Sequence, residues 1–201
     1  MVKAAIRAHG QADSVLDFGA GQGYFAGELL ASGLFRRVVA ADLMPRPADL
    51  SERMEWLQAD LNRKIPSDDL QFDLVTAVEV IEHLENPRAM MRECFRVLRH
   101  GGTLLLTTPN NETIRALISL AVRGHFAAFG PGSYPAHITA LLATDLARAS
   151  REAGFVDQTI SYSGVGMVPG MPGRTWRGLG LGILRGRRFS DNLLLSCRKP
   201  N

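Results

Sequence analysis

Residues 15–25 read VLDFGAGQGYF, and this stretch decides the fold. The apolar residues before the glycines are typical of a buried strand, and Gly19, Gly21 and Gly23 lead the chain into a helix. Glycine permits a sharp turn and lets the backbone approach a ligand that larger side chains would exclude. A dinucleotide-binding loop needs its third glycine one residue later, where this chain has Tyr24, so the pattern counts against NAD.

Outward from this loop, short apolar runs alternate with amphipathic stretches. The expected strands cover residues 14–18, 37–42, 54–59, 71–78, 102–108, 155–163 and 191–198. The expected helices cover residues 22–32, 86–98, 110–122 and 144–153. Strands that alternate with helices predict an α/β fold, a Rossmann-like, doubly wound sheet that is mostly parallel.

Local residues also predict where two of these helices begin and end. His100-Gly101-Gly102 is expected to end the helix over 86–98. Thr144 is expected to cap the helix over 144–153, and Gly154 to stop it.

Three acidic residues each close a successive strand. Asp17 ends the first strand, Asp42 the second, and Asp60 follows the third. In open α/β sheets, ligands bind at the carboxyl ends of the strands, so these carboxylates are expected to face one ligand. Asp17 suits a cationic amino group, Asp42 a pair of ribose hydroxyls, and Asp60 an adenine amino group.

With these acids, the chain resembles the class I S-adenosylmethionine-dependent methyltransferases. The resemblance covers about residues 12–163 and rests on the glycine loop, the acids and three further segments: FDLVTAVEVIEHLENP (72–87), LRHGGTLLLTTPN (98–110) and REAGF (151–155). Within the class, the pattern is most similar to ubiquinone-pathway O-methyltransferases and small-RNA 2′-O-methyltransferases. Both have a similar Glu-x-x-Glu-His after the fourth strand and Thr-Pro-Asn after the fifth.

The resemblance implies a seven-stranded sheet with an antiparallel last strand, and S-adenosylmethionine as the methyl donor. The residues it assigns to the cofactor are Asp17, Gly19, Gly21, Gly23, Asp42, Leu43, Asp60, Leu61 and Glu79.

Four further residues are candidates for the chemistry. Glu79, Glu82 and His83 share one face if a helix begins near residue 79, and His137 follows the fifth strand. Two carboxylates and two imidazoles suit Mg²⁺, Mn²⁺, Fe²⁺ or Zn²⁺, and the matching positions in small-RNA methyltransferases hold a divalent ion. One alternative is a metal-free site in which His83 or His137 is the general base. In a third interpretation Glu79 contacts cofactor or substrate, while Glu82 and His83 only cap the helix and hydrogen-bond nearby loops.

Composition narrows the function classes. A chain of 201 residues with 46% hydrophobic content predicts one domain over 1–201, and a net charge of +3 argues against a nucleic-acid partner. Cys94 and Cys197 lie in apolar stretches and are expected to be buried. We expect a cytoplasmic enzyme that methylates an oxygen of a small molecule or glycan; the alternative is a non-catalytic regulatory protein that binds S-adenosylmethionine.

Residues 164–190, the inserted segment, join two strands that a simple hairpin would connect. The segment is rich in glycine and has no acidic residue, but it contains Arg174, Arg177, Arg185, Arg187 and Arg188. It is expected to be either a flap over the acceptor or a peripheral contact with a membrane surface or lipid-linked phosphate. Six large side chains in 110–137 and 164–190 are expected to line an apolar acceptor pocket: Phe126, Phe129, Tyr134, Met167, Met171 and Trp176.

Overall fold

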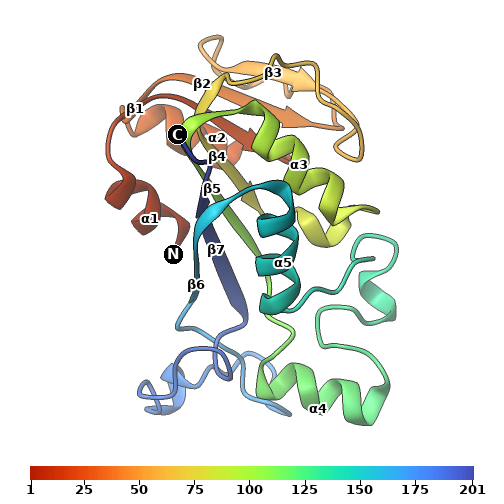
Figure 1. The fold of residues 1–201 in the computed structure, drawn as a ribbon. Coiled ribbons are helices and arrows are strands. Elements are labelled where there is room, and N and C mark those ends of the chain that lie inside the picture. The colour runs from red at the N-terminus through yellow and green to blue at the C-terminus, as the bar shows by residue number, and fades with distance from the viewer.

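A computed structural model describes all residues from 1 to 201, and its centre is one seven-stranded sheet (Figure 1). The strand order is β3-β2-β1-β4-β5-β7-β6, and only β7 is antiparallel to its neighbours, which confirms the predicted sheet. The strands are β1 (Ala12–Phe18), β2 (Phe35–Asp42), β3 (Glu55–Gln58), β4 (Phe72–Val78), β5 (Leu98–Pro109), β6 (Val156–Tyr162) and β7 (Asn192–Arg198).

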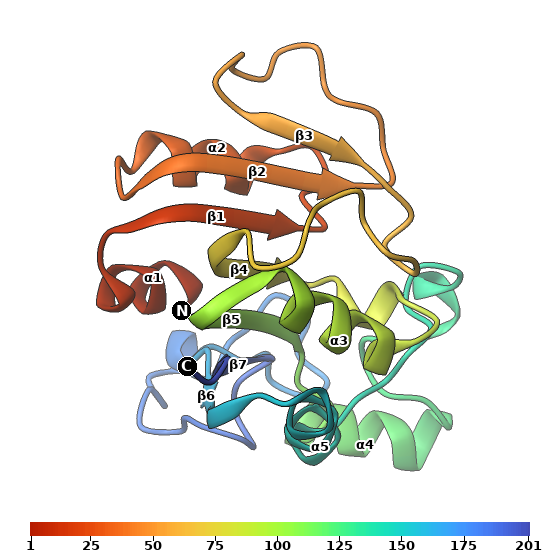
Figure 2. The ribbon, with the colours of Figure 1, turned by 45° about the horizontal axis from the view of Figure 1, so that its top comes forward.

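Helices cover both faces of the sheet (Figure 2). The helices are α1 (Val2–His9), α2 (Tyr24–Ala31), α3 (Pro87–Val97), α4 (Ile114–Arg123) and α5 (Ala143–Ala153). One core cluster contains buried residues of α3 and α5, such as Met90 and Leu146, and the other contains Ile6 of α1 and Leu29 of α2. Parallel strands covered on two faces read as continuous apolar runs, which explains why the sequence predicts them well.

Helix ends agree only partly with the prediction. Gly154 ends α5 in a left-handed conformation, as expected. The expected cap at Thr144 is wrong, because α5 begins at Ala143 and Leu142 is its N-cap. The backbone N–H of Leu142 donates to the Asp145 carboxylate at 3.1 Å, so an acid in the first turn caps the N-terminus of the helix.

Two other boundaries differ from the prediction. Residues 98–102 form the first part of β5 and do not end a helix. Phe72 of β4 pairs with Leu98 of β5, and the register between the two strands shifts between Phe72 and Leu74. Helix α4 begins at Ile114 and not at residue 110, with Thr113 as its N-cap. Helix α1 was not among the predicted elements.

The two cysteines are buried and unpaired, as expected. Burial raises the pKa of the Cys94 thiol far above its usual range and that of Cys197 to about 12, so neither thiol is reactive at neutral pH. No helix has the length and apolar character that crossing a bilayer requires.

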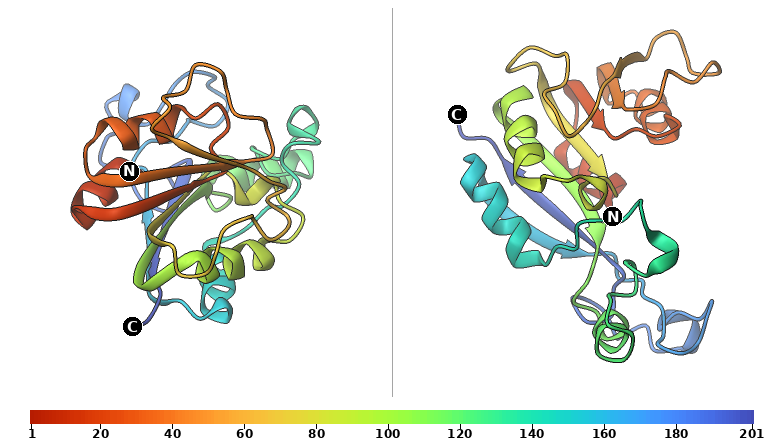
Figure 3. Two further views of the ribbon diagram at one scale, coloured as in Figure 1. Left: turned by 90° about the horizontal axis from the view of Figure 1, so that it is seen from above. Right: turned by 90° about the vertical axis from the view of Figure 1, so that its right-hand side faces the viewer.

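Helix α4 and the inserted segment lie together at the end of the molecule farthest from β3, in Figure 1 and in the right-hand view of Figure 3. The segment leaves β6 at Ser163 and returns to β7 at Asp191, where the Asp191 N–H donates to Val165 O at 2.9 Å. Inside it, Met167 and Thr175 form an isolated β-bridge, and Arg177–Leu179 form a short 3₁₀ turn (η3).

Candidate functional site

The site forms where the strand order reverses, between β1 and β4. Strand β2 follows β1 on one side, while β4 lies on the other, so the two crossovers leave a crevice at the carboxyl ends of these strands. Gly19, Gly21 and Gly23 all have positive φ angles. A Cβ on Gly19 would overlap the side chain of Val80, whereas a Cβ on Gly21 would meet no protein atom within 4 Å. Gly19 is therefore required for packing, and Gly21 faces the open crevice.

Asp17 is the most buried acid of the crevice, with only 2% of its surface exposed. The Thr76 hydroxyl donates to Asp17 Oδ1 at 2.9 Å, and Asp17 Oδ2 is buried without a hydrogen-bond partner. Burial raises the pKa of Asp17 to about 7, against the opposing hydrogen bond from Thr76. A cationic group placed against Asp17 Oδ2 would supply the missing hydrogen-bond donor and compensate the negative charge of the buried carboxylate.

Asp42 lies across the glycine loop from Asp17. Its Oδ2 accepts from the Gly21 N–H at 2.7 Å, and its Oδ1 accepts from the Met44 N–H at 3.0 Å. Each carboxylate oxygen can accept a second hydrogen bond, so two hydroxyl donors can still bind Asp42. Leu43 follows with 65% of its surface exposed, which places an apolar side chain in solvent beside this carboxylate.

Asp60 has local partners on both oxygens. Its Oδ1 accepts from the backbone N–H of Asn62 at 3.0 Å, and its Oδ2 is 3.2 Å from Nε of Arg63. This is a common turn arrangement, and it would exist without a ligand. Leu61 is buried in the main core, so only its backbone is available to a ligand.

The predicted helix that begins near residue 79 is wrong. Glu79 has φ +55°, a left-handed conformation, and the only helical structure is a 3₁₀ turn (η1) over Ile81–His83. The Glu79 N–H is held at 3.1 Å by Thr107 O at the end of β5. As a consequence, Glu79 does not join the group of possible metal ligands that contains Glu82 and His83.

The structure brings Glu82, His83 and His137 together, with one ligand atom of each within 4.8 Å of the others. The connection is the segment after η2 (Pro131–Ser133), because the N–H groups of Ile138 and Thr139 both donate to Glu82 O, at 2.9 and 3.0 Å. The rings of His83 and His137 meet edge to face with centroids 4.8 Å apart. Residues distant in sequence thus form one cluster beside the crevice.

Backbone carbonyls determine the tautomers of the two imidazoles. His83 Nδ1 is 2.7 Å from Ala136 O, and His137 Nδ1 is 2.8 Å from Ala128 O. A carbonyl oxygen only accepts, so in each neutral ring Nδ1 carries the proton and Nε2 carries a lone pair. Histidines that bind metals or act as bases are commonly oriented in this way.

Glu82 is the third member of the cluster and is fully buried. The Thr108 hydroxyl donates to its Oε2 at 3.0 Å, while Oε1 has no partner. Burial and the neighbouring charge of Glu79 raise the pKa of Glu82 to about 7. The cluster therefore offers two imidazole lone pairs and one unpartnered carboxylate oxygen, a donor set suited to Zn²⁺, Fe²⁺ or Mn²⁺ and less suited to Mg²⁺.

With this geometry in view, comparison with known proteins identifies the family. A model of the methyltransferase domain family matches residues 2–160, which include the glycine loop, the three acids and the whole Glu82 cluster. The chain belongs to this family.

Its relatives agree with the predicted methyl donor. The chain is 35% identical over 154 residues to a Mycobacterium tuberculosis protein whose name describes a probable S-adenosylmethionine-dependent methyltransferase, covering 73% of this chain and 50% of the relative. It is 34% identical over 119 residues to a ubiquinone biosynthesis O-methyltransferase of Xanthomonas oryzae pv. oryzae, covering 55% and 48%. The chain spans about half the length of these curated relatives.

Solved structures confirm the fold of this chain. A methyltransferase solved in complex with the Haloferax volcanii Trm112 methyltransferase activator superposes with a TM-score of 0.69, covering 100% of this chain and 89% of the other. At 22% identity this likeness concerns the fold alone.

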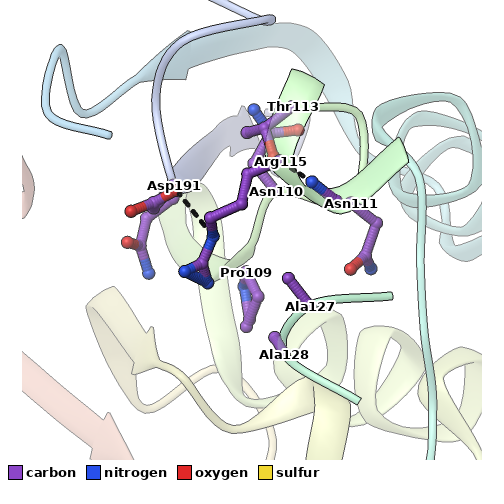
Figure 4. A pocket seen from close by; sticks show the side chains of 10 residues that line it. Pro109, Asn110, Asn111, Thr113, Arg115, Ala127, Ala128 and Asp191 are labelled. Atoms are coloured by element: carbon purple, nitrogen blue, oxygen red, sulfur yellow. Dashed lines mark hydrogen bonds and ion pairs between the residues drawn. The ribbon is translucent and has the colours of Figure 1, made fainter. Parts of the chain in front are cut away.

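Next to the cluster, the chain forms a polar pocket of about 200 Å³ that the sequence did not predict (Figure 4). Asn110 and Asn111 line it from the end of β5, and Arg115 of α4 extends across it toward Asp191, with Nε 3.9 Å from Oδ1. The Thr-Pro-Asn motif was the only sequence signal for this pocket. Arg115 belongs to a mostly apolar helix and carried no signal of its own.

The six large side chains expected to form one apolar pocket do not meet. Met167 and Met171 line a second pocket of about 580 Å³ between the inserted segment and α4. Phe129 instead contacts His137, with ring centroids 5.4 Å apart, and Trp176 packs edge-on against Phe189. Tyr134 is largely exposed, and neither it nor Phe126 lines the second pocket.

Proposed function

We propose that this chain transfers a methyl group from S-adenosylmethionine to a hydroxyl oxygen of a small molecule or glycan. The observation that carries the proposal is the pair of imidazoles, His83 and His137, whose Nε2 lone pairs are exposed beside the crevice by fixed Nδ1 hydrogen bonds. A binding protein without catalysis would need the crevice but not this pair.

The crevice suits the cofactor in three respects. The orphaned Asp17 Oδ2 would accept from the cationic amino group of the amino-acid part, and Asp42 would take the ribose hydroxyls. Gly21 leaves room for close approach, and exposed Leu43 would cover one face of the adenine. Asp60, with the backbone of Leu61, would contact the adenine edge, and Glu79, with a buried unpartnered oxygen, would face the cofactor from β4.

When bound, S-adenosylmethionine supplies a methyl group on a cationic sulfur, which an acceptor oxygen takes by in-line displacement. The chain must remove the proton of that oxygen. We assign this role to Nε2 of His83 or His137, which becomes imidazolium as the oxygen–methyl bond forms. Ionised Glu82, within the same cluster, would stabilise the resulting positive charge.

The same atoms would hold a divalent metal ion, with Glu82, His83 and His137 as ligands. A bound ion would bind the acceptor oxygen and lower its pKa, which removes the need for a free imidazole base. Treatment with EDTA separates the two mechanisms. Loss of turnover that Zn²⁺ or Mn²⁺ restores assigns the cluster to metal, while full turnover in EDTA assigns it to proton transfer.

The test is formation of S-adenosylhomocysteine from S-adenosylmethionine with a panel of phenolic, quinol and glycan hydroxyl acceptors. We expect His83→Ala and His137→Ala to lose turnover at least 100-fold while cofactor affinity stays within about threefold. His9→Ala, on exposed α1, is the matched control. Tight cofactor binding with no turnover on any acceptor would instead identify a non-catalytic binding protein.

A further inference from the structure

Helix α4 presents apolar side chains to solvent. A surface helix of a globular protein normally turns polar residues outward. In α4, Leu117, Ile118 and Leu120 are exposed, and Val122 exposes 77% of its surface. The only charged residue on the outward side of the second half of the helix is Arg123. These apolar side chains therefore remain partly open to solvent in the folded chain.

The inserted segment adds further exposed apolar side chains at the same end of the molecule. Its exposed apolar residues are Val165, Met171, Leu179, Leu181 and Ile183, and Ile183 exposes 86% of its surface. The segment and α4 are neighbours, because Met167 and Met171 line the second pocket together with Ile118 and Val122. Both lie at the same end of the molecule in Figures 1 and 3. We call this combined area the α4–insert surface.

The charges of the α4–insert surface are almost all positive. Neither residues 113–144 nor residues 158–190 contain an Asp or Glu, and their charged residues are all arginine. Of the four acids that flank these ranges, two are engaged with arginines of this surface: buried Glu112 pairs with Arg187, and Asp191 lies 3.9 Å from Arg115.

Three exposed arginines of this surface have neither an ion pair nor a side-chain hydrogen bond. Arg123, Arg174 and Arg177 make no salt bridge, and their side chains donate no hydrogen bond within the chain. Their charge is therefore available to an anionic partner.

We propose that the α4–insert surface docks on an anionic lipid bilayer. An interfacial site combines apolar side chains that enter the acyl boundary with basic side chains that contact the phosphates, and this surface has both. A nucleic acid would use the arginines but leave Val122 and Ile183 in water. A purely apolar partner would leave Arg123, Arg174 and Arg177 without a counter-charge.

The experiment is sedimentation of the full chain with phosphatidylglycerol vesicles and with phosphatidylcholine vesicles. We expect binding to phosphatidylglycerol at 50 mM salt that falls about tenfold or more at 300 mM, with weak binding to phosphatidylcholine. Absence of sedimentation with phosphatidylglycerol at low salt overturns the proposal. The proposal is also overturned if light scattering shows a dimer and binding to vesicles appears only after the dimer has been dissociated.

Two variants test the residues. The triple change Arg123→Gln, Arg174→Gln and Arg177→Gln should weaken vesicle binding about 100-fold, since each arginine near an anionic surface strengthens binding about fivefold. The double change Val122→Ser and Ile183→Ser should weaken it about tenfold or more at unchanged net charge.

The matched control removes three other exposed arginines without ion pairs: Arg7, Arg53 and Arg92. An equal loss of vesicle binding in this control would show that only net charge matters, and would overturn the assignment to this surface. Titration of each variant with S-adenosylhomocysteine is the independent readout, because the cofactor crevice shares no residue with the α4–insert surface. Failure of the vesicle-binding proposal can therefore be distinguished from failure of the proposed methyl transfer.

Discussion

Asp17→Asn should stabilise the empty protein and, at the same time, weaken cofactor binding. The carboxyl group is 2% exposed, and burial raises its pKa from 3.8 to about 7. The folded pKa lies above the unfolded one, so this group favours the fold most below pH 4, and that contribution is lost as the pH rises to about 7. Each unit of pKa difference corresponds to about 1.36 kcal/mol.

The magnitude follows from these two pKa values. At pH 5 the ionisable Asp17 lowers the free energy of unfolding by about 1.5 kcal/mol relative to a neutral side chain, and at pH 8 by about 4 kcal/mol. The asparagine of the variant cannot ionise, but its amide oxygen still accepts the hydrogen bond from Thr76. The stability advantage of the variant should therefore widen by about 2.5 kcal/mol between pH 5 and pH 8.

Urea unfolding followed by circular dichroism at pH 5 and pH 8 measures this difference. Asp13→Asn on the same strand is the control, because Asp13 is exposed and pairs with Arg36, and its variant should show no such widening. Calorimetry at pH 8 should show about 10- to 100-fold weaker S-adenosylhomocysteine binding by Asp17→Asn, the loss of one charge-assisted hydrogen bond. A stability difference that is constant with pH, or unchanged affinity, would refute the role of Asp17 derived from its burial.

Three more perturbations test other parts of the structure. Asp42→Ala should weaken cofactor binding by about 3 kcal/mol in calorimetry, with a melting temperature close to that of the wild type, because its carboxylate faces the crevice. Gly19→Ala should cost about 2–4 kcal/mol in urea unfolding, since a Cβ there overlaps Val80 at positive φ, and adding Val80→Ala should recover part of that loss. Glu112→Gln should accelerate tryptic cleavage of the inserted segment at least tenfold, because it releases Arg187. Glu152→Gln, which breaks an exposed ion pair, should not. Equal cleavage of the two variants would show that the Glu112–Arg187 pair does not hold the segment.

The sheet was predictable because its strands obey local rules. Continuous apolar runs such as 38–41 are buried on both faces, and an acid or glycine marks the end of each of the first three strands. The same logic correctly placed Asp17 and Asp42 at one edge of the sheet. The position of each of these two residues is determined by its own strand alone.

The cluster was only half predictable, because its geometry depends on distant backbone atoms. Helical periodicity grouped Glu79 with Glu82, but a hydrogen bond to Thr107 on the next strand holds Glu79 in a left-handed conformation outside the group. His137 reaches His83 because Glu82 O accepts two N–H groups from the loop that follows it. No local pattern encodes such a contact.

The start of α4 was misplaced for a similar reason. The side chain of Asn110 is engaged with Arg187 O and Ser190 O, at 2.7 and 2.8 Å, so the chain cannot become helical there. The sequence shows a polar residue before an apolar stretch, which is typical of a helix start. Only the fold shows that this amide belongs to the inserted segment.

That use of Asn110 has an evolutionary consequence. The Asn110 side chain, at the end of β5, binds the C-terminal end of the inserted segment at Ser190 O. Strand β7 therefore enters the sheet at the same point whatever the conformation of the inserted segment. Lengthening a loop between fixed ends costs only about 0.6 kcal/mol per doubling. The segment can thus gain, lose or exchange residues while the crevice around Asp17 stays intact. New specificities can arise in this part of the gene without disturbing the residues proposed to hold the methyl donor.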